Sequence, residues 1–271
     1  MAKVKSIVID LWNPNSFTVE LQQALTAESQ LIFDYHSEVR RLMDEHRNSS
    51  PHQSLNSNGF NADYLWFQEH TLTPILAKTR IRAWHYTRLL NHEVKAMCRR
   101  LVLSSLEFLQ ERLHALVAME VLSQEEADVV LEESPFRSQG DIRSGKLWTV
   151  TVPLHSGDER VSPLLGSWGG ESAYFGLSDE SLAAKLNSLG VPRILEIEVA
   201  LSDDLNAFKA SGTVLKAWAK KLGISTVPSG CDLAITNCLS TAKLMRAHTE
   251  GESTFDAVAN TYPGGVGELI T

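Results

Sequence analysis

Hydrophobic and polar residues alternate with a period of two in several short stretches of the chain, which is the pattern of half-buried β-strands. These stretches cover residues 4–12, 80–88, 146–154 and 195–201, with two weaker ones at residues 232–236 and 243–248. In the second stretch, Trp84 and His85 would point to opposite faces, because successive side chains of a strand alternate. We therefore expect a sheet that carries His85 in the middle of one strand.

Other stretches repeat their hydrophobic residues at helical spacing. They cover residues 17–46, 91–100, 103–119, 123–133 and 179–189. The fourth of them opens with Ser123 and Glu126 at the spacing of a capping box, in which the two side chains satisfy backbone amides at the start of a helix. Residues 48–61 are polar and contain Gly and Pro, which predicts an exposed loop.

Strands and helices in this order predict an α+β protein. Residues 1–75 would form an N-terminal strand and helical extension, and residues 76–271 an α+β domain, either separate or merged into one. The helices between residues 91 and 133 would be a helical insert between two strands of the sheet.

Composition narrows the functional classes. The 271 residues are 43% hydrophobic and 21% charged, which is typical of globular domains and excludes a largely disordered chain. The formal net charge of -8 disfavours bulk binding to nucleic acids or anionic membranes. The three cysteines (Cys98, Cys231 and Cys238) form no disulfide framework or zinc motif, and no signal-peptide core or membrane span stands out. We expect a soluble, cytoplasmic protein with no membrane partner.

Common catalytic motifs are missing from the sequence: the phosphate-binding loop, the HExxH zinc pair, the GxSxG elbow and a GxGxxG turn after a strand. Asp44, Glu45 and His46 would point in different directions from a helix, so we predict no metal site. His85 stands out because it lies in mid-strand between two aromatic residues. Taken alone, a histidine in this position is more often structural than functional.

The order of several segments gives His85 more weight. A strand with His85-Tyr86-Thr87 is followed by a helical insert, a second strand, the pair Gly169-Gly170 ahead of Tyr174-Phe175, and a strand that reads RILEIEVAL. This order resembles the ADP-ribosyltransferase superfamily over roughly residues 80–248 and leaves the N-terminal part outside. The resemblance implies that superfamily's small mixed or antiparallel split sheet. It also implies an enzyme that cleaves the nicotinamide–ribose bond of NAD, its substrate, and transfers ADP-ribose to an acceptor.

Carried over residue by residue, the resemblance implies three catalytic positions. His85 would hydrogen-bond the nicotinamide ribose, and Tyr174 would stack on the nicotinamide ring. The superfamily's glutamate, which grips the ribose 2'-hydroxyl, has no clear counterpart, because the matching strand offers Asp232, one methylene shorter. Glu171 and Glu250 are the other acidic candidates.

The resemblance also implies residues that hold the nucleotide around the same cleft. They are Tyr86, Thr87, Gly169 and Gly170, together with Arg82 and Arg88, whose guanidinium groups would contact an anionic ligand.

Other functions remain open. The protein would alternatively bind a nucleotide or a phosphorylated ligand without transfer, or act as a non-enzymatic interaction protein whose N-terminal helices pack on a protein partner. In the latter case His85 and Tyr174 would be buried core residues. A hydrolase using Cys231 or Cys238 with a distant histidine rests on residue types alone. As an enzyme, the protein would be a toxin, effector or regulator with an undefined acceptor.

Overall fold

A computed structural model describes residues 7–48, 57–202, 204–226, 229–236 and 242–262. The chain divides into two compact units, the first formed by residues 1–82 and 200–231 and the second by residues 83–199 and 232–271. Each unit therefore combines two separate parts of the chain. The boundary expected near residue 75 lies close to residue 82, where the chain passes from the first unit to the second. The return of residues 200–231 to the first unit was not predicted from the sequence.

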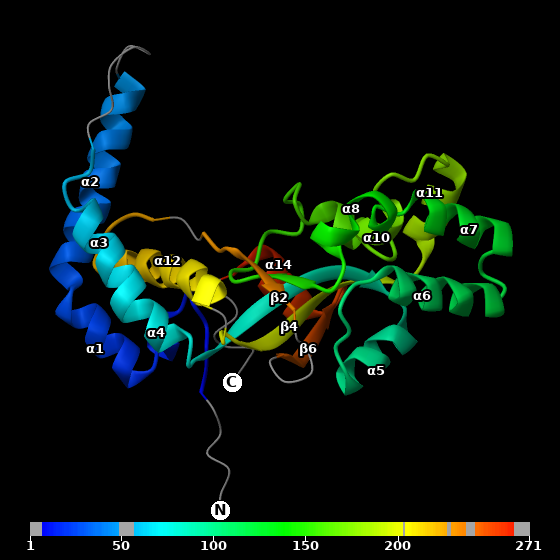
Figure 1. Ribbon diagram of the computed structural model, residues 1–271, viewed down its shortest axis with the longest axis horizontal. Coiled ribbons are helices and arrows are strands. Elements are labelled where there is room, and N and C mark those ends of the chain that lie inside the picture. Colours follow the sequence, from blue (N-terminus) through cyan, green and yellow to red (C-terminus); the bar gives the residue numbers. More distant parts are fainter. Residues whose placement is uncertain (1–6, 49–56, 203, 227–228, 237–241, 263–271) are drawn as a thin grey trace, which may run out of the picture. The chain divides into compact units, whose positions relative to one another are not determined.

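The first unit consists largely of helices (Figure 1). In chain order its elements are β1 (Val8–Ile9), η1 (Pro14–Ser16), α1 (Val19–Ala27), α2 (Ser29–Asn48), α3 (Asn61–Phe67), the π-helix η2 (Gln68–Leu72), α4 (Thr73–Leu76) and α12 (Asp204–Lys221). β1 pairs in parallel with the first two residues of β2 (Arg80–Leu89), which belong to this unit. Of the strand expected over residues 4–12, residues 4–6 lie outside the described residues, and residues 10–12 do not continue β1.

Helix α12 explains why the chain returns to the first unit. It packs against α2, α4 and η2, and it buries a run of apolar side chains, which are Ala207, Ala210, Val214, Leu215 and Trp218. The indole nitrogen of Trp218 donates a hydrogen bond to the hydroxyl of Ser29 at 3.2 Å. The Gln68 amide donates to the carbonyl oxygen of Phe208 at 3.1 Å. The helix therefore contributes both apolar burial and specific polar contacts to this unit.

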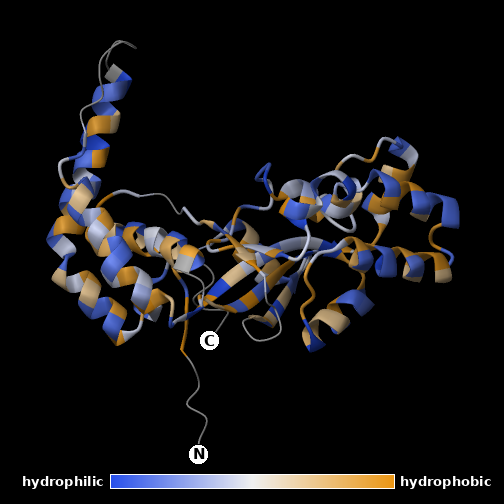
Figure 2. Cartoon of the chain, in the orientation of Figure 1, coloured by the Kyte–Doolittle hydropathy of each residue, from blue (hydrophilic) through white to orange (hydrophobic). Residues whose placement is uncertain are grey.

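The surface of the first unit is not uniformly polar. Hydrophilic residues cover much of α2 (Figure 2), whereas α3 leaves Leu65 and Trp66 exposed at 41% and 61%. None of the described helices is both long and apolar enough to cross a membrane.

The second unit is built on an open sheet in which the strand order is β5-β3-β2-β4-β6. The strands that join β2 are β3 (Leu147–Val150), β4 (Val191–Ala200), β5 (Asp232–Ile235) and β6 (Ala242–Thr249). β3 pairs antiparallel with both β2 and β5, and β4 pairs antiparallel with β6. Strands far apart in the sequence, such as β3 and β5, are thereby brought side by side.

Helices fill the connections between these strands (Figure 1). Between β2 and β3 lie α5 (Asn91–Arg99), α6 (Leu106–Ala118), α7 (Gln124–Glu133) and α8 (Phe136–Arg143). Between β3 and β4 lie α9 (Ser162–Gly166), α10 (Glu171–Tyr174) and α11 (Glu180–Ser188), and α14 (Ser253–Asn260) follows β6. α7 begins at the predicted capping box, because Ser123 Oγ accepts from the Glu126 amide at 3.2 Å and the Glu126 carboxylate accepts from the Ser123 amide at 2.7 Å.

Two apolar cores stabilise the second unit. One joins Trp84 and Tyr86 of β2 to Ile194 of β4 and to Phe255 and Val258 of α14. The other lies among α6, α7 and α11 and encloses Trp168. Since Trp84 and Tyr86 face α14, the alternation of the strand turns His85 to the opposite face of β2.

The sheet opens between β2 and β3. β3 pairs with β5 over four residue pairs, but with β2 its one described pair joins Trp84 to Val150. The mixed helices and strands, the split antiparallel sheet, the N-terminal helices and the helical insert confirm the predicted α+β fold class. Of the expected loop, residues 49–56 lie outside the described residues.

Candidate functional site

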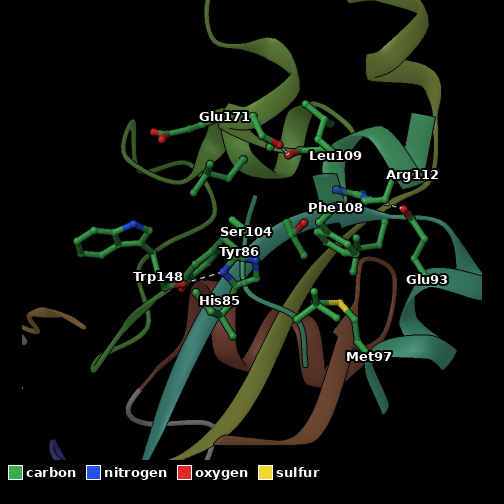
Figure 3. A pocket seen from close by; sticks show the side chains of 18 of the residues that line it. His85, Tyr86, Glu93, Met97, Ser104, Phe108, Leu109, Arg112, Trp148 and Glu171 are labelled. Carbon is green, nitrogen blue, oxygen red and sulfur yellow. Dashed lines mark hydrogen bonds and ion pairs between the residues drawn. The ribbon is translucent and has the colours of Figure 1, made fainter. Parts of the chain in front are cut away.

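A pocket of about 860 Å³ lies in the second unit, where β2 and β3 separate. Most of its wall comes from β2, β3, the helical insert and the segment that leads into α10, and α9 and Asp232 of β5 also contribute. In Figure 3, His85 lies between Trp148 on one side and the Arg112–Glu93 pair on the other. The volume is in the range of small-molecule and cofactor sites.

His85 is fixed at this opening by a hydrogen bond that crosses between the two strands. Its Nδ1 atom lies 2.8 Å from the backbone carbonyl oxygen of Trp148 (Figure 3). A carbonyl oxygen only accepts, so Nδ1 carries the proton in the neutral ring and Nε2 keeps its lone pair. Burial lowers the pKa of His85, and the positive charge of Arg112 lowers it further against the opposing effect of the Trp148 bond. The ring is therefore a neutral imidazole with a hydrogen-bond acceptor at Nε2.

Apolar and aromatic side chains form much of the remaining wall. Met97, Phe108 and Leu109 of the insert line the pocket with Trp148 of β3, and Figure 3 shows Met97 and Phe108 on the insert side of His85. Phe108 is half-buried, and Trp148 is 42% exposed. Trp148 lies two residues before Val150 on β3, so its ring shares the face of Val150 and Trp84. Phe108 is therefore the ring on the His85 side on which a planar ligand group would stack.

Positive and negative side chains are equally numerous in the described lining of the pocket, and two ion pairs join some of them. Arg112 donates from Nε to Glu93 at 2.7 Å, and both side chains are nearly buried. At the rim, Arg143 forms an ion pair with Glu171. Among the described residues the lining contains four arginines and four carboxylates, namely Arg100, Arg112, Arg143 and Arg160 with Glu93, Glu111, Glu171 and Asp232. The pocket is thus formally neutral before His85 is counted, and ligand recognition must depend on local geometry.

The paired glycines shape the rim next to Glu171. Gly169 and Gly170 have φ values of +85° and +59°, which side chains rarely allow. A Cβ on Gly169 would lie 2.6 Å from the Cβ of Ala173. Gly169 therefore permits the close turn that starts α10 at the pocket.

The register of the sheet separates Asp232 from His85. Asp232 pairs with Val150, and Val150 pairs with Trp84. Directly paired residues share one face, so the Asp232 side chain lies on the Trp84 face and His85 on the other. The charge of Asp232 helps to raise the pKa of Arg160, after the larger effect of the Arg160 hydrogen bonds to Asp158, whereas Arg112 is the charge that acts on His85. The two proposed catalytic groups line one pocket from opposite faces of its strands.

Tyr174 occupies a different place from the one expected. It ends α10, is half-exposed, and is not among the described residues that line the pocket. Burial raises its pKa. The expectation that its ring and the His85 imidazole share one pocket is therefore not met. Phe108 and Trp148 are the accessible rings there instead.

The residues expected to hold the nucleotide divide into two groups. Tyr86, Thr87, Gly169 and Gly170 line the pocket, and the Tyr86 hydroxyl is tied to the backbone of Leu154, donating at 2.9 Å and accepting at 2.6 Å. Burial raises the pKa of Tyr86, which keeps the phenol protonated.

Arg82 and Arg88 are not among the described lining residues. Arg88 is committed to the fold, because it donates to the carbonyl oxygens of Leu189 at 2.7 Å and Leu165 at 3.3 Å. In the pocket, the nearly buried guanidinium is that of Arg112, which no motif of the sequence singles out.

The remaining candidates contribute little to the site. Glu250 follows β6 and does not belong to the described lining, and neither does Cys231. Cys238 lies outside the described residues. Within the described part of the chain, no group of three His, Cys, Asp or Glu side chains is placed to hold a metal ion.

No protein-family model, curated protein or solved structure matches this chain. Its function has to be inferred from the pocket itself.

Proposed function

We propose that the second unit binds NAD or a related nucleotide in the pocket at His85. The observation that carries this proposal is a neutral, orientation-locked imidazole whose Nε2 acceptor is available in an aromatic-lined pocket of about 860 Å³. A ribose hydroxyl is a natural donor to such an acceptor, and Phe108 offers a face for a heterocyclic ring. The order of segments that resembles the ADP-ribosyltransferase superfamily selects NAD as the first ligand to test.

Binding is tested by isothermal titration calorimetry of the full chain with NAD. We expect saturable binding that His85→Ala abolishes. His114→Ala provides a matched control, because His114 lies on the insert helix α6, is exposed and does not belong to the described lining. Failure of the wild-type protein to bind NAD or NADP would remove this function.

Cleavage of the nicotinamide–ribose bond is the second candidate. It is favoured by the presence of two carboxylates, Glu171 and Asp232, in the same lining as His85. In this reaction the C1'–N bond breaks with its electron pair leaving on nicotinamide, and a hydroxyl of water or an acceptor forms the new C1'–O bond and loses its proton. A carboxylate would offset the positive charge that develops on the ribose.

Nicotinamide release, measured by chromatography, separates cleavage from binding alone. If Glu171 supplies the acidic group, Glu171→Gln should lower release at least tenfold while NAD still binds, and Asp232→Asn should have little effect. The reverse result would assign the role to Asp232. Binding without release by the wild-type protein would leave the binding function and exclude turnover.

A further inference from the structure

We propose that Arg112 is an anion-binding residue of the pocket and takes a phosphate group of the ligand. The inference deepens the proposed function, since the phosphates would be those of the nucleotide, but it does not require any bond of the ligand to break. Arg112 lies on α6, in the middle of the helical insert, and belongs to no motif of the sequence.

Arg112 is held in one orientation by its surroundings. Glu93 accepts from its Nε at 2.7 Å, and the guanidinium carbon lies 4.3 Å from the ring centroid of Trp168 and 5.7 Å from that of Phe108. Trp168 is fully buried behind it, and Phe108 belongs to the pocket lining. An arginine stacked in this way keeps its planar fork without losing further side-chain entropy on binding.

The acceptor capacity of Glu93 is used on the protein side. Besides Arg112, its carboxylate accepts from the indole nitrogen of Trp168 at 3.1 Å and from the Leu90 amide at 2.7 Å. Glu93 therefore anchors α5, Trp168 and Arg112 together. It fixes the Nε edge of the guanidinium and leaves the other edge for a ligand.

That second edge is unfilled among the described residues. A guanidinium has five N–H donors, and only the Nε donor of Arg112 has a hydrogen bond there. Nη2 is buried without a partner, although 12% of the side chain as a whole is exposed. A buried donor without an acceptor is costly, and an anionic oxygen that reaches it recovers that cost. The two-pronged shape matches two oxygens of one phosphate.

The position of Arg112 also fits a ligand that joins phosphate to a ring. Phe108, which contacts the guanidinium, lies in the same lining as His85. Arg112 is close enough to lower the pKa of His85. A phosphate at Arg112 and a ribose hydroxyl at His85 Nε2 are therefore neighbouring parts of one nucleotide.

Calorimetric titration of four probes tests this assignment: NAD, ADP, inorganic pyrophosphate, and nicotinamide riboside, which lacks phosphate. We expect Arg112→Gln to weaken binding of the three phosphate-bearing probes roughly 10- to 100-fold, the effect of losing a charge-assisted bond, and to leave any riboside binding unchanged. Arg112→Lys, which keeps the charge but not the fork, should give a smaller loss. Arg137→Gln is the matched control, because it removes an equal charge from an exposed residue outside the described lining.

Equal affinity of wild type and Arg112→Gln for ADP and pyrophosphate would overturn the assignment, as would an equal loss for the riboside. It would also fall if the wild-type protein bound neither ADP nor pyrophosphate. Pyrophosphate or ADP binding that depends on Arg112, without binding of NAD, would retain the anion site and reject the proposed function. If Arg112→Gln does not fold, as judged by its melting curve, Arg112→Lys replaces it in the test. Equal affinity of wild type and Arg112→Lys for ADP and pyrophosphate would then overturn the assignment.

Discussion

The Nδ1 atom of His85 lies 2.8 Å from the carbonyl oxygen of Trp148 and connects β2 to β3 where their backbone pairing ends. The side chain thus supplies a hydrogen bond between the two strands beyond their described backbone pairing. The same bond sets the tautomer, so in the proposed function the fold uses one nitrogen of the ring and the ligand uses the other.

The roles of the two His85 nitrogens can be tested separately with an asparagine. His85→Asn places an amide donor near the position of Nδ1 and removes Nε2, so the bond to Trp148 is retained while the ligand acceptor is lost. We expect its melting temperature to stay close to that of the wild type and its NAD binding to fall at least tenfold. His85→Ala should lose both the bond to Trp148 and the ligand acceptor, so its melting temperature and its NAD affinity should both fall. Equal NAD affinity of His85→Asn and wild type would show that Nε2 has no part in recognition.

Acid should destabilise the first unit through His36. Its Nε2 lies 3.0 Å from the Tyr64 hydroxyl, and burial, with the charge of Lys216, lowers its pKa from 6.5 to about 4. Below pH 6.5 the unfolded chain binds a proton that the folded chain resists, so stability should fall as pH drops toward about 4. Allowing for partial exposure, the loss is of order 1–2 kcal/mol.

Urea unfolding between pH 7.5 and 4.5, roughly the range of this titration, checks that prediction. His36→Gln should flatten the decline relative to wild type, and His46→Gln, at an exposed histidine of the same helix, should not. Parallel curves for wild type and His36→Gln would contradict it.

Removal of Glu93 should destabilise the second unit. Glu93→Ala leaves Arg112, Trp168 and the Leu90 amide without their shared acceptor. Breaking a nearly buried pair of this kind should cost about 3 kcal/mol in urea unfolding, and Glu93→Gln, which keeps one oxygen acceptor, should cost less. Glu45→Ala, at an exposed pair with Arg41, should change stability little. A loss below about 0.5 kcal/mol for Glu93→Ala would show that this carboxylate is not an anchor.

The paired glycines should differ in their tolerance of a side chain. At Gly169 a Cβ would collide with Ala173 at 2.6 Å, whereas at Gly170 the nearest atom belongs to Leu164 at 3.9 Å. Both have positive φ, so Gly170→Ala should cost about 1–3 kcal/mol, and Gly169→Ala about 1–3 kcal/mol more because the collision adds to the strain. Chemical denaturation of both variants checks the order, and equal losses would contradict it.

Much of the sheet was predictable, because alternation is a local property. The strand with His85, the α7 capping box and the strands at residues 195–201 and 243–248 follow from sequence spacing, and the structure has them within a few residues. The pairing register was not predictable. It depends on which residues of distant strands meet, and it moves Asp232 to the face opposite His85.

Arg112 was missed for a related reason. On the sequence it is one charged residue of an amphipathic helix, which usually means a solvated face. Its role becomes visible only when Glu93 of another helix and Trp168 of a distant loop enclose it. The return of α12 to the first unit likewise depends on packing against α2 and α4, which no local pattern encodes.

Calorimetric titration of the full chain with NAD, carried out in parallel on the wild-type protein and His85→Asn, tests the proposed site at His85 most directly. We expect saturable binding to the wild type and a loss of at least tenfold in affinity for the variant, with both proteins melting at similar temperatures. Absence of wild-type binding at millimolar NAD, or equal affinity of the two proteins, would contradict the proposed site.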